Sequence, residues 1–251
     1  AVWLPWLGLA LAGAVRPLSL VWAKTFGPAP RLAVVVPTRD EAVRLGACLG
    51  SLAAPLAAGE IAEVVVADGG SRDATVDVAR AHGARVVVAA GGRGGQIAAG
   101  VAACASEAVL VLHADCRMEA DVPRRVLGAL SRAPQTAGGA VGMRFAGGGT
   151  GLSLVSGLNS LRARFFGISF GDQGQFFRRE ALAAGGGFPD MALMEDVELS
   201  LRLREAGETV LLGGGLVVSP RRWSGESFFV RTFSVLRLFT AYLAARRLGL
   251  A

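Results

Sequence analysis

The feature that most constrains the fold is an alternation of short apolar runs with longer amphipathic segments in the first half of the chain. Four runs of strand length, at Leu32–Val36, Ile61–Ala67, Arg85–Ala90 and Ala108–Leu112, are separated by segments whose apolar residues recur at helical spacing. Strands that alternate with helices are joined by right-handed crossovers and form a largely parallel sheet. The sequence therefore predicts an α/β fold with a mostly parallel, Rossmann-like sheet flanked by helices.

The pattern changes beyond residue 134, where shorter strands and glycine-rich joints replace the regular alternation. We expect this half to cover the edge of the sheet as an elaboration of the same domain. The segments expected to be helical are residues 40–54, a helix capped by Asp73, and residues 96–105, 121–130, 152–166, 195–206 and 227–250. Further strands are expected at residues 139–145, 174–178 and 209–218.

Composition and charge exclude several classes of protein. With 251 residues, 52% of them hydrophobic and 18% charged, the chain can bury a large core, which argues against disorder. The net charge of +6 is unevenly spread, since residues 1–31 carry +3 and residues 209–251 carry +5, which leaves −2 on the body. Basic flanks that are also apolar suit an anionic membrane surface better than nucleic acid. We therefore expect peripheral membrane contact through both termini and no nucleic-acid partner.

The two flanks set the predicted domain boundaries. Residues 1–30 form an apolar segment that proline and glycine interrupt. Its uninterrupted apolar part is shorter than the about 20 residues that a bilayer span needs, so we expect an interfacial or docking segment. Residues 31–223 form the α/β domain. Residues 224–251 form an apolar and basic helix whose scattered arginines disfavour a transmembrane span, so that it either packs on the domain or docks on a membrane. Three cysteines without metal-type spacing indicate a reducing compartment, which predicts a cytoplasmic protein, peripheral at the inner face of the membrane.

Polar clusters follow the four apolar runs, at the point where each expected strand ends. They are Pro37-Thr38-Arg39-Asp40-Glu41, Asp68-Gly69-Gly70-Ser71, the glycine loop Gly91–Gly95 with Arg93, and Leu112-His113-Ala114-Asp115. Parallel strands bring their carboxyl ends to one edge of the sheet, where α/β proteins bind ligands. Side chains two residues apart on a strand point the same way, so His113 and Asp115 are expected to face one ligand. Each cluster alone is typical of an ordinary turn, but the four together favour a nucleotide site with an arginine for phosphate and a carboxylate for a divalent cation.

The nucleotide is not expected to bind as it does in dehydrogenases or P-loop proteins. The first turn lacks G-x-G-x-x-G, and the chain contains no G-x-x-x-x-G-K-[ST]. A second acidic cluster, Met194-Glu195-Asp196-Val197-Glu198, opens an expected helix. Acids are common at helix N-termini because the helix dipole favours negative charge there. The functional alternative is that one of them is a carboxylate base near the chemistry.

In their order along the chain, these motifs resemble those of the family 2 glycosyltransferases, which have a GT-A fold. The resemblance runs from Leu32 to Trp223 and also rests on Gly171-Asp172-Gln173-Gly174-Gln175-Phe176 and Arg221-Arg222-Trp223. Each motif is weak by itself, and the set is specific. The sequence is most similar to a bacterial subgroup that carries His-Ala-Asp and Gly-Asp-Gln-Gly.

The resemblance implies an inverting, metal-dependent transfer of a sugar from a nucleotide-sugar donor to a hydroxyl acceptor, which on this reading includes lipid-linked acceptors. It implies that Asp196 is the general base, supported by Glu195, and that Asp115 binds Mn²⁺ or Mg²⁺, with His113 as a further candidate ligand. The nucleotide-binding residues it implies are Pro37, Thr38, Arg39, Glu41, Asp68, Arg93, Gly94, Gln96, His113, Ala114 and Asp115. The loop that would face donor and acceptor consists of Gly171, Asp172, Gln173 and Gly174, joined near the diphosphate by Arg221, Arg222 and Trp223.

His113 departs from the family pattern, because many relatives carry the first aspartate of a D-x-D motif at this position. Neutral imidazole binds Mn²⁺ but is a poor ligand for Mg²⁺. Asp115 therefore either binds the metal alone, with water and phosphate oxygens, or shares it with His113. Alternatively, His113 forms a hydrogen bond with the ribose. No histidine follows position 113, so a later histidine ligand is absent from the sequence.

Two other functions stay open at this point. A sugar-phosphate nucleotidyltransferase shares the nucleotide-binding architecture, but it usually has a glycine-rich loop with Arg or Lys directly after the first strand, and Pro37–Glu41 contains no glycine. A non-catalytic, membrane-associated nucleotide-binding protein is favoured by His113. The presence of Asp115, Glu195 and Asp196 argues against that reading.

Overall fold

The computed structural model describes residues 25–27, 31–191, 193–223 and 228–249. The chain divides into two compact units, one of Lys24–Ser219 and one of Ala1–Ala23 with Pro220–Ala251. The strands named below all belong to the first unit, and the second holds the short 3-10 helix η2 (Pro220–Trp223) and the helix α10 (Phe228–Arg247). Most of the apolar segment predicted at residues 1–30 lies outside the described residues. No helix within the described ranges is both long enough and apolar enough to cross a bilayer.

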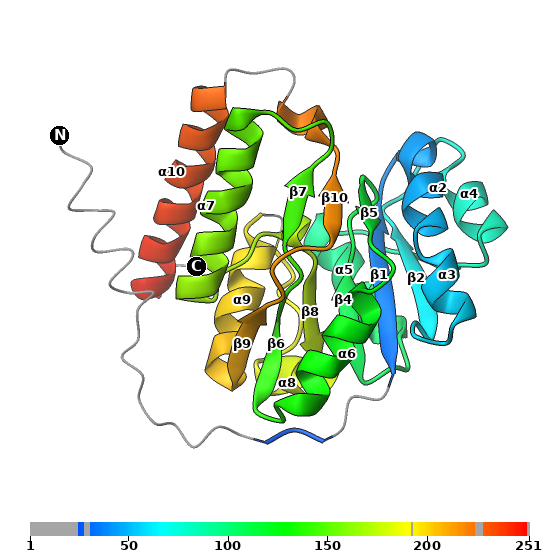
Figure 1. Cartoon of the computed structure of the whole chain (residues 1–251), viewed down its shortest axis with the longest axis horizontal. Coiled ribbons are helices and arrows are strands. Elements are labelled where there is room, and N and C mark those ends of the chain that lie inside the picture. The colour runs from blue at the N-terminus through cyan, green and yellow to red at the C-terminus, as the bar shows by residue number, and fades with distance from the viewer. Residues whose placement is uncertain (1–24, 28–30, 192, 224–227, 250–251) are drawn as a thin grey trace. The chain divides into compact units, whose positions relative to one another are not determined.

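A seven-stranded sheet forms the centre of the first unit (Figure 1), with the strand order β3-β2-β1-β4-β8-β6-β9. Its strands are β1 (Leu32–Thr38), β2 (Glu63–Asp68), β3 (Arg85–Val88), β4 (Ala108–Val111), β6 (Thr136–Ala140), β8 (Gln175–Arg178) and β9 (Glu208–Leu211). The strands β3, β2, β1 and β4 are parallel, as are β6 and β9, whereas β8 runs antiparallel to both of its neighbours. Every residue of β1 is buried, as expected for a central strand of a sheet that is covered on both faces. The predicted mostly parallel sheet is confirmed.

A second, three-stranded sheet has the order β5-β10-β7, with β5 (Cys116–Met118), β7 (Met143–Phe145) and β10 (Leu216–Val218). The sequence predicted a strand at residues 139–145 and a strand broken by three glycines at 209–218, and the structure divides both segments into two strands. Each segment leaves the large sheet and enters the small one, so that β6 pairs with β9 and β7 pairs with β10. The bend occurs at Gly142 and at Gly213–Gly215, all of which have positive φ. Glycine adopts this conformation without the steric cost that other residues meet.

The helices connect the strands in chain order. They are α2 (Ala42–Gly50), α3 (Ala53–Ala57), α4 (Thr75–Ala81), α5 (Gly92–Ala103), α6 (Val122–Arg132), α7 (Thr150–Phe166), α8 (Arg179–Ala184) and α9 (Glu195–Ala206), with the 3-10 helix η1 at Gly171–Gln173. The helix predicted at residues 40–54 is divided into α2 and α3. Pro55 gives the reason, because its ring and its missing N–H prevent α2 from continuing through it. The short elements β5 and α8 were not predicted, since neither is long enough to show a period.

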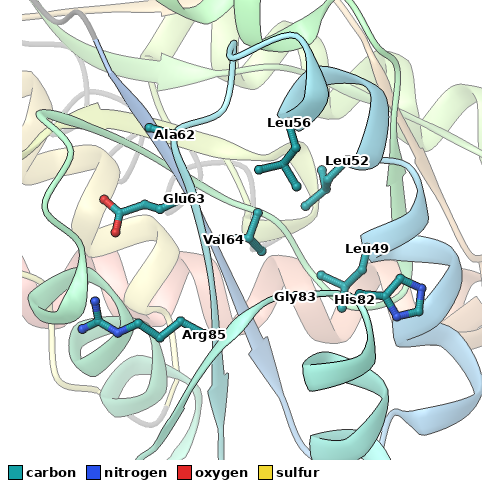
Figure 2. Close-up of a pocket in the computed structure, with 9 residues that line it drawn as sticks. All are labelled: Leu49, Leu52, Leu56, Ala62, Glu63, Val64, His82, Gly83 and Arg85. Carbon is teal, nitrogen blue, oxygen red and sulfur yellow. The ribbon is translucent and has the colours of Figure 1, made fainter.

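Alternate residues of the strands face two different helical layers, as the pleat of a sheet requires. On one face, Val35 and Val65 belong to a buried cluster with residues of α5, α8 and α9. On the other face, Val64 lies beside Leu49, Leu52 and Leu56 of the α2–α3 region (Figure 2). Phe26 also belongs to the cluster under α9, although it precedes the predicted domain boundary at residue 31.

The residues in Figure 2 line a hollow of about 260 Å³ at the amino ends of β2 and β3, where Glu63 and Arg85 begin these strands. The glycine and aspartate motifs follow the carboxyl ends of β1 and β2 instead, since Thr38 and Asp68 are the last residues of these strands. The hollow therefore lies at the end of the sheet opposite to the motif residues.

Candidate active site

The carboxyl ends of β1 and β2 meet at Thr38 and Asp68, which are register partners. The Asp68 side chain is 2% exposed. One of its oxygens, Oδ2, accepts hydrogen bonds from the N–H groups of Gly70 (3.0 Å) and Ser71 (2.9 Å). The other, Oδ1, accepts from the hydroxyls of Ser71 (2.5 Å) and Thr38 (3.4 Å). Asp68 therefore fixes the loop after β2 at this edge of the sheet.

The loop after β1 is bonded directly to the loop after β2. The N–H of Asp40 donates to Ser71 Oγ (2.9 Å), and the N–H of Arg72 donates back to Asp40 Oδ1 (2.8 Å). Asp40 holds a left-handed conformation with φ of 52° to make these contacts. The predicted site residue Glu41 forms an ion pair with Arg44 (3.1 Å), and Arg39 is exposed. The two loops thus form one rigid wall, while the side chain of Arg39 extends from it into solvent.

The third cluster is the first turn of a helix. The sequence predicted a glycine loop at Gly91–Gly95 and a helix from Gln96, but α5 begins at Gly92, so Arg93, Gly94 and Gln96 are helical. That prediction was wrong because glycine has a low helix propensity, which favoured a loop. In the structure, close packing of α5 leaves no room for a side chain at Gly94. A Cβ on Gly94 would stand 2.4 Å from the carbonyl oxygen of Met191, and one on Gly69 would stand 1.8 Å from Gln96 Nε2. The glycines let α5 approach both the loop before α9 and the loop after β2.

Arg93 of α5 forms an ion pair with Glu195, the first residue of α9, through Nε and Oε1. Glu195 is 1% exposed, and no group in the described part of the chain donates a hydrogen bond to its buried Oε2. Burial raises the pKa of Glu195, and the charge of Asp196 raises it further, while Arg93 opposes the shift. The carboxyl group of Glu195 is thus held between a cation and a neighbouring acid.

Asp196 lies where α9 meets the Gly171–Gly174 loop. Its Oδ2 accepts the N–H of Gly171 (2.8 Å), and its Oδ1 accepts the N–H of Val197 (2.8 Å). A Cβ on Gly171 would stand 2.7 Å from His113 Nε2 and 3.5 Å from Asp196 Oδ2. His113 and Asp196 therefore approach the same glycine from different elements.

The structure corrects one premise about His113 and Asp115. They were expected to be strand residues with parallel side chains, but β4 ends at Val111, and His113 begins a turn that the N–H of Cys116 closes on the His113 carbonyl (3.0 Å). His113 is buried against Gly171, whereas Asp115 is partly exposed. The alternation rule of strands does not apply to residues in a turn.

The side chain of Gln173 is fully buried beneath the loop. Its Oε1 accepts from Arg162 Nη2 (2.9 Å) and from the N–H of Phe170 (3.0 Å), and its Nε2 donates to the carbonyl of Asn159 (3.3 Å). Gln175 Nε2 likewise donates to the carbonyl of Asp196 (2.8 Å). The two glutamines therefore bond this part of the chain to α7 and to α9.

Arg162 of α7 is the residue that sequence reasoning missed. Its charge acts on both Asp172 and Asp196, although the three residues belong to three different helices. A signal was available, because Val155, Asn159 and Ala163 repeat every four residues and mark the buried face of α7, beside which Arg162 falls. Because buried polar side chains need hydrogen-bond partners, Asn and Arg on a buried face predict a polar neighbour, and in the structure this neighbour is the Gly171–Gly174 loop.

The remaining predicted residues are less constrained. Within the described residues, no three His, Cys, Asp or Glu side chains form a group that could hold a metal ion by themselves. Asp115 is a single carboxylate, and a single carboxylate can bind a cation when the phosphates of a substrate supply further oxygen ligands. Arg221, Arg222 and Trp223 form η2 in the other unit, and their role stays a prediction.

Comparison with known proteins agrees with this architecture. A family model described as glycosyl transferase family 2 matches residues 33–184. A beta-monoglucosyldiacylglycerol synthase of Synechocystis sp. is 27% identical over 234 residues, which cover 80% of this chain and 49% of that protein. The chain thus spans about half the length of this curated relative.

Two solved structures share the fold. Residues 1–349 of Staphylococcus aureus TarS match with a TM-score of 0.60 and 18% identity, covering 83% of this chain and 64% of that one. Mycobacterium tuberculosis glucosyl-3-phosphoglycerate synthase, in complex with Mn²⁺, UDP and glucosyl-3-phosphoglycerate, matches with a TM-score of 0.57 and 21% identity, covering 94% and 85% of the two chains. These likenesses confirm the α/β fold of the GT-A type. Since the family model covers more than half of the sequence, from β1 to α8, the chain belongs to glycosyl transferase family 2.

Proposed function

We propose that this chain is an inverting glycosyltransferase that moves a sugar from a nucleotide-sugar donor to a hydroxyl acceptor. The observation that carries the proposal is the meeting of the acidic start of α9 with three other elements: Arg93 of α5, Gly171 of η1 and, across Gly171, His113 after β4. Family membership supports it, and so does a structural neighbour, TarS, whose structure was solved in complex with UDP-GlcNAc.

The nucleoside would lie against the wall formed by the first two loops. Thr38, Asp68 and Gln96 gather there, with Gly69 leaving room for the amide of Gln96. Arg93 and Gln96 are three residues apart on α5 and so lie on one side of the helix. A nucleotide that contacts Gln96 through its nucleoside would therefore place its phosphates toward Arg93, whose guanidinium suits phosphate geometry.

Asp196 would act as the base for the acceptor hydroxyl. An inverting transfer needs one carboxylate opposite the leaving group and forms no covalent enzyme intermediate. Backbone N–H groups hold both oxygens of Asp196, which fixes the direction of its remaining lone pairs. Its position at the start of α9 favours its negative charge. The acceptor proton would pass to this carboxylate as the hydroxyl oxygen attacks the anomeric carbon and the nucleoside diphosphate leaves.

Asp115 is a carboxylate that suits a divalent cation, Mn²⁺ or Mg²⁺, entering with the diphosphate, whose oxygens would supply further ligands. Asp115 would hold it through a partly exposed carboxylate, and His113 is a further candidate ligand. When bound, such a cation neutralises charge on the leaving group. The neighbour from M. tuberculosis was crystallised with Mn²⁺ and UDP, which supports this part of the proposal.

The acceptor is proposed to be a hydroxyl compound, with a lipid-linked hydroxyl as the first class to test. The name of the Synechocystis relative specifies a glucosylated diacylglycerol. The helix α10 exposes Val230, Phe233 and Leu236, and its sequence from Phe228 to Arg247 contains arginine but no acid. Such a helix suits peripheral contact with an anionic leaflet at the inner face of the membrane.

Binding of nucleotides gives a direct test. We would measure thermal stabilisation by UDP, GDP, dTDP and their sugars, each with Mn²⁺, Mg²⁺ or EDTA, in the wild type, in Asp115→Ala and in the surface control Asp121→Ala. We expect selective, metal-dependent stabilisation in the wild type and the control, and its loss in Asp115→Ala. Absence of a shift with every nucleotide would contradict it. Stabilisation by nucleoside triphosphates, with pyrophosphate release, would favour the nucleotidyltransferase reading, and selective binding without any transfer would favour the non-catalytic one.

A further inference from the structure

The side chain of Arg162 leaves α7 four residues before the helix ends and contacts the chain on either side of the start of η1. Three of its nitrogens donate to three different acceptors. Nε donates to the carbonyl of Ile168 (3.1 Å), Nη1 to Asn159 Oδ1 (2.9 Å) and Nη2 to Gln173 Oε1 (2.9 Å). The guanidinium thus joins α7 to the chain on both sides of Phe170.

The guanidinium also stacks on an aromatic ring, since its Cζ lies 3.4 Å from the centre of the Phe170 ring. A cation over an aromatic face is attracted by the ring quadrupole. Burial lowers the pKa of Arg162 to about 10, so the side chain keeps its charge at neutral pH. Within the described part of the chain, no carboxylate forms an ion pair with it, and the negative charges that act on it are those of Asp172 and Asp196.

A short path of contacts runs from Arg162 to the proposed base. Gln173 Oε1, which accepts from Arg162, also accepts the N–H of Phe170 (3.0 Å). Phe170 directly precedes Gly171, whose N–H donates to Asp196 Oδ2 (2.8 Å). Arg162 therefore holds both ends of the three-residue helix that contacts Asp196.

We infer that Arg162 is a positioning residue of the transfer site. It fixes η1 so that the N–H of Gly171 meets Asp196, and its charge offsets the repulsion between Asp172 and Asp196. Arg162 contacts neither the nucleoside wall nor Arg93, so its role is to be sought in the transfer step and not in donor binding. This inference rests on the proposed function for its catalytic consequence, while its structural part stands on the contacts alone.

The test uses two substitutions at Arg162 and a matched control on the same helix. Arg162→Lys keeps a positive charge but loses the planar fork that bonds Gln173 and Asn159 together. Arg162→Met removes the charge and all three hydrogen bonds at similar length. Arg164→Met is the control, because Arg164 lies two residues further on and is exposed. Gln173→Leu removes the acceptor while leaving Arg162 in place, and so tests the same contact if Arg162→Met does not fold.

The first readout is hydrogen exchange at the Gly171 amide in the full chain, which needs no substrate. Loss of the Arg162 contacts should accelerate exchange by about tenfold or more in Arg162→Met, Arg162→Lys and Gln173→Leu, and leave Arg164→Met unchanged, because the amide is protected only while η1 holds it against Asp196. Wild-type protection in all three variants would overturn the inference.

The second readout separates binding from transfer. In Arg162→Lys, we expect kcat to fall by about 100-fold, the cost of misplacing a reacting group by roughly 1 Å, with UDP affinity within about threefold of the wild type. Equal losses in affinity and kcat, or no loss at all, would contradict a positioning role in transfer. If the wild type transfers no sugar to any acceptor, the proposed function fails, and the exchange measurement still decides whether Arg162 holds η1.

Discussion

Arg93 on α5 and Glu195 on α9 form an ion pair in which the arginine is partly exposed and the glutamate is buried, with side-chain exposures of 32% and 2%. The two residues come from helices that follow different halves of the sheet. The pair therefore joins the nucleoside side of the candidate site to the side that holds Asp196.

The pH dependence of stability should report the buried carboxyl group. The pKa of Glu195 is raised in the folded protein, mainly by burial, so the folded state favours the protonated acid more than the unfolded state does. Glu195 therefore contributes stability at a pH below its unfolded value of about 4.3, and this contribution is lost as the pH rises through the folded value. Urea unfolding of the wild type and Glu195→Gln across pH 4 to 9 measures it. The stability of the wild type relative to the variant should decline with rising pH, and a constant difference would contradict this assignment.

Binding of a nucleoside diphosphate should take up protons. If Arg93 turns to the diphosphate, Glu195 loses the cation that opposes its raised pKa, and the acid then binds a proton. Calorimetry of UDP binding across pH 5 to 8, in two buffers with different ionisation enthalpies at each pH, should show a pH-dependent proton uptake that does not exceed about one proton per nucleotide. In Glu195→Gln the uptake should vanish while UDP still binds. Equal uptake in both proteins would place the titrating group elsewhere.

Gly171 should tolerate no side chain. A Cβ there would stand 2.7 Å from His113 Nε2 and 2.9 Å from His113 Cε1, so Gly171→Ala must displace the buried imidazole or the loop. We expect a loss of about 1–3 kcal/mol in the free energy of unfolding and a large loss of transfer activity. Gly157→Ala is the matched control, because Gly157 lies within α7 with open space at its Cβ position. That change should raise stability by roughly 0.5–1 kcal/mol, the helix preference for alanine. Equal effects of the two changes in urea unfolding would refute the account of Gly171.

Asp68 should be required for the shape of the nucleoside wall. Its two oxygens accept four hydrogen bonds, and Asp68→Asn replaces one of those acceptors by a donor. Leaving a buried partner unsatisfied costs about 1–3 kcal/mol, so we expect a lower melting temperature together with weaker UDP binding. Asp77→Asn on α4 serves as the control. Unchanged UDP affinity in Asp68→Asn would show that this carboxyl group does not shape the nucleotide site.

The sequence predicted the sheet and most of the helices because the first half of the fold follows local rules. The run at Leu32–Val36 is apolar throughout, and the structure buries it on both faces as the central strand β1. A period of two or four residues is visible in one sequence, since it depends only on near neighbours along the chain. The polar clusters after these strands could be assigned to one edge of the sheet for the same reason.

The parts that were missed depend on contacts between distant residues. The helical start of α5 is decided by close packing of Gly94 against Met191, which no local pattern reveals. The turn at His113 leads into β5, which pairs with the distant strand β10. Arg162 and Arg164 are arginines of the same predicted helix, and only the structure shows that Arg162 is partly buried whereas Arg164 is exposed. Tertiary packing overrides local preference at each of these positions.

A transfer assay in which donor class and acceptor are varied together tests whether Asp196 is the base of a sugar transfer. Release of nucleoside diphosphate and formation of glycosylated product would be measured for wild type, Asp196→Asn and the surface control Asp121→Asn, with Mn²⁺ present. The acceptors would include diacylglycerol in mixed micelles and water-soluble hydroxyl compounds. We expect transfer by the wild type and the control, with kcat reduced by about 10²–10⁴-fold in Asp196→Asn while donor binding is retained. Transfer by Asp196→Asn at the wild-type rate would show that Asp196 is not the base.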